Sequence, residues 1–399
     1  MNIKEIAEGI RYVGVNDRVT EKFEGMWPLP YGVSYNSYLV EGSEKSALMD
    51  TVEIEGVNRY LDEVTAALQG RALDYLVIHH MEPDHSGSIP EVLKRWPGIK
   101  VVCSRQAADM VKGFYHVEDA DMFIIVNDGD SIDLGGKTLQ FVMTPMVHWP
   151  ETMMTLVPEL KLLFSGDAFG CFGALNGAVI DADMDTSRYI GEMYRYYSNI
   201  VGKYGKFVQK ALGKLEGVAL DYICSTHGPV WHERIGDVTA IYDKLSRYGS
   251  EPGAVIVYGS MYGNTAAVAE EIARGLADAG VRNIIVHNAS VSPMSVMISD
   301  AFRHKCLIVG SATYSMTLFP PVAEFIEAMQ VREIKDKVFA GFGGYTWAPN
   351  AVKGAMEKFC AETGIEMQEF VMMKQSIDSS VRAQAFELGK KLASLEGVK

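Results

Sequence analysis

The stretch that decides the fold is Asp74–His85, DYLVIHHMEPDH, where a short apolar run leads directly into a dense series of imidazoles and carboxylates. The apolar run predicts a strand over Tyr75–Ile78. Loops at strand ends are where a sheet scaffold places reactive groups. Alternating side chains of this kind reach different positions around a pair of metal ions. The candidate ligands in this stretch are His80, Glu82, Asp84 and His85.

Three further candidates follow other predicted strands. They are His148 in TPMVHWP, Asp167 in FSGDAFG and His227 in CSTHGPVW. Four imidazoles and three carboxylates are enough for two metals, and one carboxylate can bridge both. Iron, zinc and manganese all accept this donor set. The other histidines have no motif support: His79 is expected to support or pack beside the ligands, and His116, His232, His287 and His304 are expected to be structural.

A polar, turn-prone segment at Arg247–Gly253, RYGSEPG, separates two parts of the chain that differ in their pattern of predicted strands and helices. Before it, short strands come in succession with helices at Gly56–Gln69, Ile89–Trp96 and near Thr186–Leu215, which predicts packed sheets flanked by helices. After it, strand and helix alternate regularly, which predicts a doubly wound parallel sheet. The chain is therefore expected to be of the α/β class, with domains at residues 1–249 and 254–399.

Three loops of the second domain resemble a cofactor cradle. The first, SMYGNT, joins the strand Ala254–Tyr258 to an amphipathic helix, and N–H groups at a helix N-terminus bind phosphate. It matches neither the Walker loop nor the dinucleotide fingerprint, so a single phosphate fits best. The other loops lie at carboxyl ends of strands, where open α/β sheets bind ligands. The candidates are Ser260, Met261, Tyr262, Gly263, Asn264 and Thr265; Ser311, Ala312, Thr313 and Tyr314; and Gly343, Gly344, Tyr345, Thr346 and Trp347.

The composition of the chain argues against several classes of function. The chain has 399 residues with 37 basic and 51 acidic side chains, a net charge of −14, which argues against nucleic acid as a partner. No apolar run is long enough to span a bilayer, and the N-terminus does not resemble a signal peptide. We therefore expect no membrane association and a cytoplasmic location. The five scattered cysteines form no C-x-x-C pair, so neither a rubredoxin-type centre nor disulfides are expected.

The metal motif resembles the metallo-β-lactamase superfamily, whose signature is H-x-H-x-D-H followed by distant His, Asp and His. Glu82 stands where the hydrolases have their second histidine, as is characteristic of the flavodiiron proteins. The second domain resembles flavodoxin, with FMN as ligand. The resemblance spans nearly the whole chain and implies an αββα sandwich followed by a flavodoxin-like domain, the minimal two-domain class. It also implies two irons, one held by His80, Glu82 and His148, the other by Asp84, His85 and His227, with Asp167 bridging.

In such families electrons pass from FMN to the diiron centre, where dioxygen is reduced to water or nitric oxide to nitrous oxide. The resemblance implies a head-to-tail homodimer or larger assembly and an electron donor, either a rubredoxin-like protein or a reduced deazaflavin coenzyme. It also places a tyrosine near the substrate, for which Tyr197 is our candidate catalytic residue. Many relatives carry a histidine in an early Phe-His-Gly segment, whereas this chain has Glu24 there, so substrate preference does not transfer directly.

Two other readings stay open. The first alternative is a lactamase-type hydrolase fused to a flavodoxin. Hydrolysis needs no flavin, and Glu82 in place of the second histidine also counts against this alternative. An electron carrier with a structural metal site is the other. An FMN spectrum and the rate of flavin reoxidation in air distinguish the three.

Overall fold

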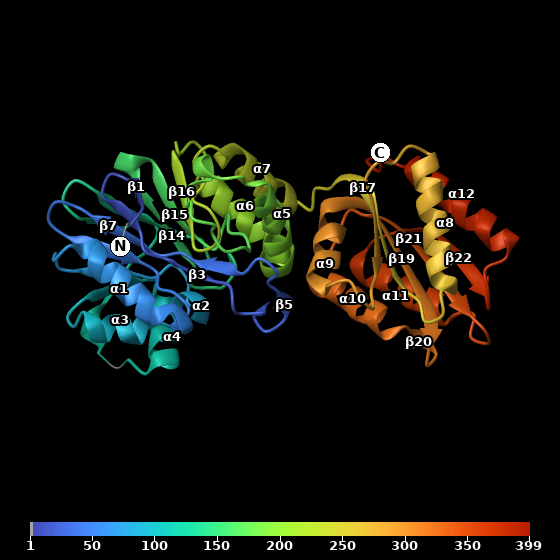
Figure 1. Cartoon of the computed structure of the whole chain (residues 1–399), viewed down its shortest axis with the longest axis horizontal. Coiled ribbons are helices and arrows are strands. Elements are labelled where there is room, and N and C mark those ends of the chain that lie inside the picture. Colours follow the sequence, from blue (N-terminus) through green and yellow to red (C-terminus); the bar gives the residue numbers. More distant parts are fainter. Residues whose placement is uncertain (1–2, 118) are drawn as a thin grey trace. The chain divides into compact units, whose positions relative to one another are not determined.

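The structure is a computed structural model that describes residues 3–117 and 119–399. The chain divides into two compact units, Met1–Asp243 and Lys244–Lys399 (Figure 1). The strand that opens the second unit, β17 (Glu251–Gly259), begins inside the segment that the sequence suggested was a linker. Glu251 is ordered there by Lys244 and Arg303, whose side-chain nitrogens lie 3.1 and 2.7 Å from its two carboxylate oxygens.

The first unit is built on two large sheets. The first sheet has the order β1-β2-β7-β8-β9-β10-β11 and the second β12-β13-β14-β15-β16. Two small antiparallel pairs, β3–β6 and β4–β5, accompany them. The strands of the first sheet are β1 (Glu5–Ala7), β2 (Ile10–Tyr12), β7 (Tyr38–Glu41), β8 (Ser46–Met49), β9 (Tyr75–Val77), β10 (Lys100–Cys103) and β11 (Phe123–Ile125). Those of the second are β12 (Ser131–Asp133), β13 (Thr138–Met143), β14 (Met153–Val157), β15 (Leu162–Gly166) and β16 (Tyr222–Ser225), and the small pairs are β3 (Val15–Asp17), β6 (Val33–Tyr35), β4 (Lys22–Phe23) and β5 (Trp27–Pro28).

Central strands of both sheets are buried along their whole length. Every residue of β8, β9, β14 and β15 is buried, with no alternation between faces. Such strands must be covered on both sides. The sheets cover one another: Tyr38 of β7 packs its ring 5.3 Å from that of Phe164 on β15 and donates a hydrogen bond to the carbonyl of Ser225. The predicted αββα sandwich is confirmed.

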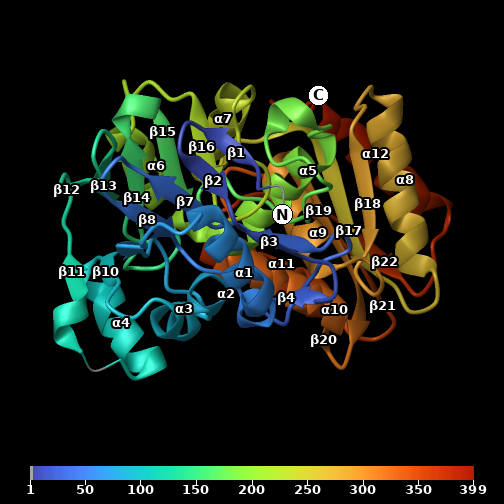
Figure 2. The same cartoon turned by 60° about the vertical axis from the view of Figure 1, so that its left-hand side comes forward.

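Helices complete the layers of the first unit. Figures 1 and 2 show α1, α3 and α4 beside the first sheet and α5, α6 and α7 near the second. The single long helix expected near Thr186–Leu215 is interrupted by a π-helical turn at Tyr197–Val201, and Gly202 follows it with a φ of 39°. The helices are α1 (Val57–Leu68), α2 (Pro83–Ser86), α3 (Ile89–Arg95), α4 (Arg105–Tyr115), α5 (Ser187–Tyr196), α6 (Gly205–Lys214) and α7 (Ile235–Ser246).

The second unit has the predicted doubly wound sheet. Its strands are parallel in the order β18-β17-β19-β21-β22, the flavodoxin-like arrangement. Helices α8 and α12 lie on one face and α9, α10 and α11 on the other (Figure 1). The first pair approaches closely at Gly275, where a Cβ would lie 2.0 Å from the carbonyl oxygen of Phe386. The remaining bounds are α8 (Asn264–Asp278), β18 (Ile284–Asn288), α9 (Met294–Arg303), β19 (His304–Tyr314), β20 (Thr317–Leu318), α10 (Pro320–Val331), β21 (Val338–Tyr345), α11 (Ala351–Thr363), β22 (Met367–Lys374) and α12 (Ser379–Ala393).

Two expectations from composition can be compared with the structure. Within residues 3–117 and 119–399, no helix is both long and apolar enough to cross a membrane. All five cysteines are free thiols, and Cys103, Cys171, Cys224 and Cys306 are buried. These four cysteines therefore behave as small apolar core residues, as expected, while Cys360 is half-buried.

Candidate metal centre and cofactor pocket

The seven predicted metal ligands all follow the carboxyl ends of strands. His80 and Glu82 follow β9, while Asp84 and His85 lie in the short helix α2 just beyond. Because β13 and β15 are both antiparallel to β14, and β16 is parallel to β15, the three strands end at the same edge of the second sheet. The residues that follow them there are His148, Asp167 and His227.

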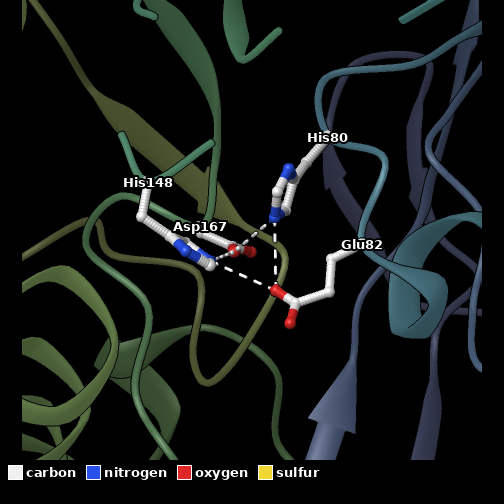
Figure 3. A group of neighbouring side chains, drawn as sticks. All are labelled: His80, Glu82, His148 and Asp167. Carbon is white, nitrogen blue, oxygen red and sulfur yellow. Dashed lines mark hydrogen bonds and ion pairs between the residues drawn. The ribbon is translucent and has the colours of Figure 1, made fainter. Parts of the chain in front are cut away.

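The structure gathers these side chains into two adjoining groups, both buried. In the first group, Nε2 of His80 and Nε2 of His148 lie 3.3 and 3.2 Å from Oε2 of Glu82. The same two nitrogens lie 3.4 and 3.1 Å from Oδ2 of Asp167 (Figure 3). Four donor atoms from three loops therefore converge on one point.

The second group repeats the pattern. Nε2 of His85 and Nε2 of His227 each lie 3.2 Å from Oδ2 of Asp84. The other oxygen of Asp167, Oδ1, lies 2.9 Å from Nε2 of His85 and 3.9 Å from Nε2 of His227. Asp167 thus turns one oxygen to each group, which is the geometry of a bridging carboxylate.

Neighbouring groups fix the orientation of the imidazoles. Nδ1 of His80 lies 2.8 Å from Oε1 of Glu151, a buried carboxylate that also accepts a hydrogen bond from the backbone N–H of Met81. Nδ1 of His227 lies 2.8 Å from the carbonyl oxygen of Ser34. A hydrogen bond donated at Nδ1 leaves Nε2 as the ligand atom. Glu151 was not predicted from the sequence, although it lies only three residues after His148.

The donor set fits metal cations. Among the described residues, both carboxylate oxygens of Asp84, both ring nitrogens of His85 and Nε2 of His227 are buried without a hydrogen-bond partner. Buried polar atoms are nearly always satisfied, and a cation at this point would satisfy Oδ2 of Asp84 and Nε2 of His85 and of His227. The predicted role of the seven residues is consistent with this geometry.

The pKa shifts of the side chains in these two groups also favour bound cations. Burial opposes ionisation of Asp167, but His85 and His80 outweigh it and hold the pKa of that carboxyl well below its usual range. Burial lowers the pKa of His148, yet hydrogen bonds with Asp167 and Glu82 raise it to about 9. The carboxylates therefore stabilise positive charge among them, whether it is carried by protons or by metal ions.

The structure brings a different tyrosine to the cluster from the one predicted. The ring of Tyr197 packs 5.0 Å from that of Tyr242. The ring of Tyr196 lies 5.5 Å from that of His227, and its buried hydroxyl has no hydrogen-bond partner in the described part of the chain. A π turn begins at Tyr197, directly after Tyr196, and π turns are frequent at functional sites.

Glu24 also lies close to the metal-binding residues. It belongs to the β4–β5 hairpin, where its Oε2 accepts a hydrogen bond of 2.8 Å from Nε1 of Trp27. It lines a cavity together with Glu82 and Asp84. Burial and the charge of Glu82 raise the pKa of Glu24 to about 7.

The second unit contains a cavity of about 220 Å³ beyond the carboxyl ends of its strands. Most of the predicted cofactor residues line it: Ser260, Met261, Tyr262, Asn264, Thr265, Ala312, Thr313, Gly344, Tyr345, Thr346 and Trp347. Gly263, Ser311, Tyr314 and Gly343 do not line it. Three lining residues were not predicted, Ala348, Met373 and Gln375. The last two come from β22 and the residues after it, a strand that the sequence analysis missed.

The cavity suits a phosphorylated flat ring. Helix α8 begins beside it at Asn264 with no side-chain cap, so its first N–H groups are available to a phosphate. Tyr262 and Trp347 line the cavity yet are 90% and 81% exposed, which leaves aromatic faces for a ring to cover. Gly344 adds no side chain to this wall, where its nearest neighbour is the terminal methyl of Met373.

Comparison with known proteins gives consistent matches in both units. The family model of the ODP family beta lactamases matches residues 33–228, and the flavodoxin model matches residues 256–389. The anaerobic nitric oxide reductase flavorubredoxin of Aeromonas hydrophila is 31% identical over 97% of this chain and 79% of its own length. The solved structure of rubredoxin oxygen:oxidoreductase from Desulfovibrio gigas aligns with a TM-score of 0.93, 26% identity and 98% coverage of each chain. That of the flavodiiron protein from Giardia intestinalis aligns with a TM-score of 0.93 and 25% identity, covering 98% of this chain and 96% of that one.

Proposed function

The chain belongs to the flavodiiron proteins, and on that premise we propose that it reduces nitric oxide to nitrous oxide, dioxygen to water, or both, at a non-haem diiron centre supplied with electrons by FMN. The observation that carries the proposal is the placement of Asp167, whose two oxygens face two separate groups of donors. One iron is assigned to His80, Glu82 and His148, and the other to Asp84, His85 and His227. The carboxylate of Glu82 adds an oxygen donor, which suits iron.

When bound, FMN and the two irons supply the electrons, two from the flavin and one from each iron. Dioxygen needs four electrons and four protons to become two waters, and two nitric oxides need two of each to become nitrous oxide and water. The chain's own part is to hold the ligands, exclude bulk water and deliver protons. For proton delivery the geometry favours Tyr196 over Tyr197, because the ring of Tyr196 lies 5.5 Å from that of His227 whereas the ring of Tyr197 packs on Tyr242.

The electron donor and the assembly form the second part of the proposal. Two relatives carry rubredoxin in their names, and a rubredoxin-like protein is our first choice of donor; a reduced deazaflavin coenzyme is the alternative. Exposed apolar groups at or next to the loops of the cofactor cavity, Tyr262, Met316 and Trp347, supply a surface that another protein can cover. We propose a head-to-tail homodimer in which the FMN of one chain serves the diiron centre of its partner, acting in the cytoplasm.

The central test measures composition and turnover together. Iron-supplied protein should contain two irons and one FMN per chain, and the reduced protein should consume nitric oxide or dioxygen with a common donor in an anaerobic chamber. Two zincs with hydrolase activity and no reductase activity would overturn the proposal. Flavin reoxidation in air no faster than in a variant without metal ligands would indicate an electron carrier instead.

The assembly is tested by complementation. A variant with His80→Ala and Asp167→Ala has no metal centre, and one with Gly344→Phe has a blocked flavin cavity. Each homodimer should be inactive, but refolding the mixture gives about half heterodimers, each with one working pair of sites. About a quarter of wild-type activity should therefore return. Heterodimers without recovered activity would show that electrons pass within one chain.

A further inference from the structure

A cavity of about 330 Å³ gives access to both halves of the metal-binding cluster. Glu82 of the first group and Asp84 of the second both line it. On its other walls are the β4–β5 hairpin and the residues where a short 3₁₀ helix, Ile54–Gly56, begins. A small molecule that reaches the metal centre through this cavity passes between these residues.

The cavity wall is strongly acidic. Its charged residues are Lys22, Glu24, Glu53, Glu55, Glu82 and Asp84. Bound metal ions would neutralise Glu82 and Asp84. The acidic side chains left along the approach would be Glu53 and Glu55, together with the partly protonated Glu24, against the single ammonium of Lys22. Within the described residues, neither Glu53 nor Glu55 has an ion-pair partner, and Oε1 of Glu53 is held at 3.1 Å from the backbone N–H of Ile54. Among the described residues neither charge is therefore neutralised by a direct ion pair, and the hydrogen bond to Ile54 holds Glu53 in position.

We propose that Glu53 and Glu55 make this cavity a charge filter that admits neutral diatomic molecules to the metal centre and excludes small anions. The inference rests on the proposed function, because nitric oxide and dioxygen are neutral whereas azide and nitrite, which also bind iron, are anions. Charges of one sign in a cleft with low-dielectric walls focus the potential along it. Specificity then comes from repelling the competitor, at no cost to binding of a neutral substrate.

The test removes the two charges and keeps the shape. The variant Glu53→Gln with Glu55→Gln is compared with Glu8→Gln with Glu44→Gln, which removes two charges at the opposite edge of the first sheet, in the β1–β2 and β7–β8 turns. Azide affinity of the oxidised, iron-loaded full chain is measured from its absorption spectrum, and nitric oxide binding is measured on the reduced protein. We expect the first variant to bind azide roughly tenfold more tightly at low salt, with nitric oxide affinity unchanged and the control like wild type.

Salt gives an independent readout. The rate of azide binding to wild type should rise with ionic strength, because salt screens the repulsion, and this dependence should flatten in the first variant. Equal azide affinity in variant and wild type would overturn the filter. An equal increase in nitric oxide affinity in the variant would also overturn the charge filter. Such an increase would mean that the substitutions widened the cavity rather than removed a repulsive charge.

Failure of the filter can be told apart from failure of the proposed function. Cobalt(II) accepts the same imidazole and carboxylate ligands, and its visible absorption reports anion binding. Cobalt-loaded protein therefore tests the filter whichever metal is resident, while iron content and reductase turnover test the proposed function.

Discussion

The carboxylate of Glu151 lies 2.8 Å from Nδ1 of His80, on the side of the ring opposite the metal-binding cluster. The pair is buried, with the His80 side chain 1% and the Glu151 side chain 0% exposed. A carboxylate in this position fixes the ring orientation and makes Nε2 a better ligand. Glu151 therefore acts through His80 and touches neither metal nor substrate.

The variant Glu151→Gln should weaken iron binding by roughly 10- to 100-fold, because the amide removes the negative charge behind His80 while keeping its size. Competition with a chelator measures the affinity, and FMN content should not change. The matched control is Glu159→Gln, in the 3₁₀ helix Pro158–Leu160 after β14, where the carboxylate accepts hydrogen bonds from the backbone N–H and the hydroxyl of Thr138. Iron affinity equal to wild type would show that Glu151 is only a packing residue.

Asp167→Ala should abolish reductase activity while the chain stays folded and yellow. Its carboxylate holds both groups of donors together, so the substitution leaves each metal one ligand short and removes the charge that screens the two cations from each other. The FMN cavity belongs to the other compact unit and has its own core. Metal analysis, FMN content and circular dichroism check the three parts; a variant with full iron and normal turnover would rule out the bridging role.

Tyr196→Phe should lower turnover roughly 10- to 100-fold at unchanged iron and FMN content, as expected when a proton donor is lost. Tyr197→Phe is the matched control, because its ring packs on Tyr242 rather than on a ligand. A solvent isotope effect that changes only in the first variant separates proton delivery from packing. The opposite ranking of the two variants would restore Tyr197 as the candidate.

The ligands could be predicted because four of them lie in one short motif, while Glu151 and Tyr196 could not. Glu151 lies 71 residues from His80 in the chain, and no local pattern signals that contact. Tyr196 and Tyr197 are adjacent in the chain, and only their tertiary contacts with His227 and Tyr242 show which of them faces the ligands. Gln375 was missed because VMMK in β22 lacks the alternation that marks a strand.

Stability of the second unit should depend on pH through Lys337. Its ammonium is buried and donates to Oγ of Ser250 at 2.7 Å and to the carbonyls of Phe302 and His304 at 2.7 and 2.9 Å. Burial, followed by the charge of Lys305, lowers the pKa of Lys337 from 10.5 to about 7. Between these values the unfolded chain binds the extra proton, so stability rises as pH increases and is lost as pH falls toward 7.

Between pH 7 and pH 9 the titration of Lys337 should raise the free energy of unfolding by about 2 kcal/mol. Urea unfolding of wild type and Lys337→Met at several pH values measures it, and subtracting the two curves cancels the other titrating groups. The free energy of unfolding should rise with pH only in wild type relative to the variant. Parallel pH profiles would mean that the three acceptors keep Lys337 protonated throughout.

The last prediction concerns where the FMN domain begins. A fragment of residues 254–399, the domain predicted from the sequence, cuts β17 after its third residue. It removes Glu251, which Arg303 contacts at 2.7 Å, and the N–H of Gly253, which donates to the carbonyl of Val398. It also removes Ser250, one of the three hydrogen-bond acceptors around the buried nitrogen of Lys337.

A fragment of residues 244–399 keeps all these contacts and coincides with the second compact unit. It should fold alone, bind one FMN and be more stable than residues 254–399 by roughly 2–3 kcal/mol, the cost of a buried unsatisfied donor together with the lost strand pairing. Urea unfolding and fluorescence titration with FMN compare the two. The variant Ser250→Ala in the longer fragment isolates the Lys337 contact and should account for about 1 kcal/mol of the difference. Equal stability of the two fragments would return the boundary to residue 254 and show that the start of β17 adds nothing to the domain.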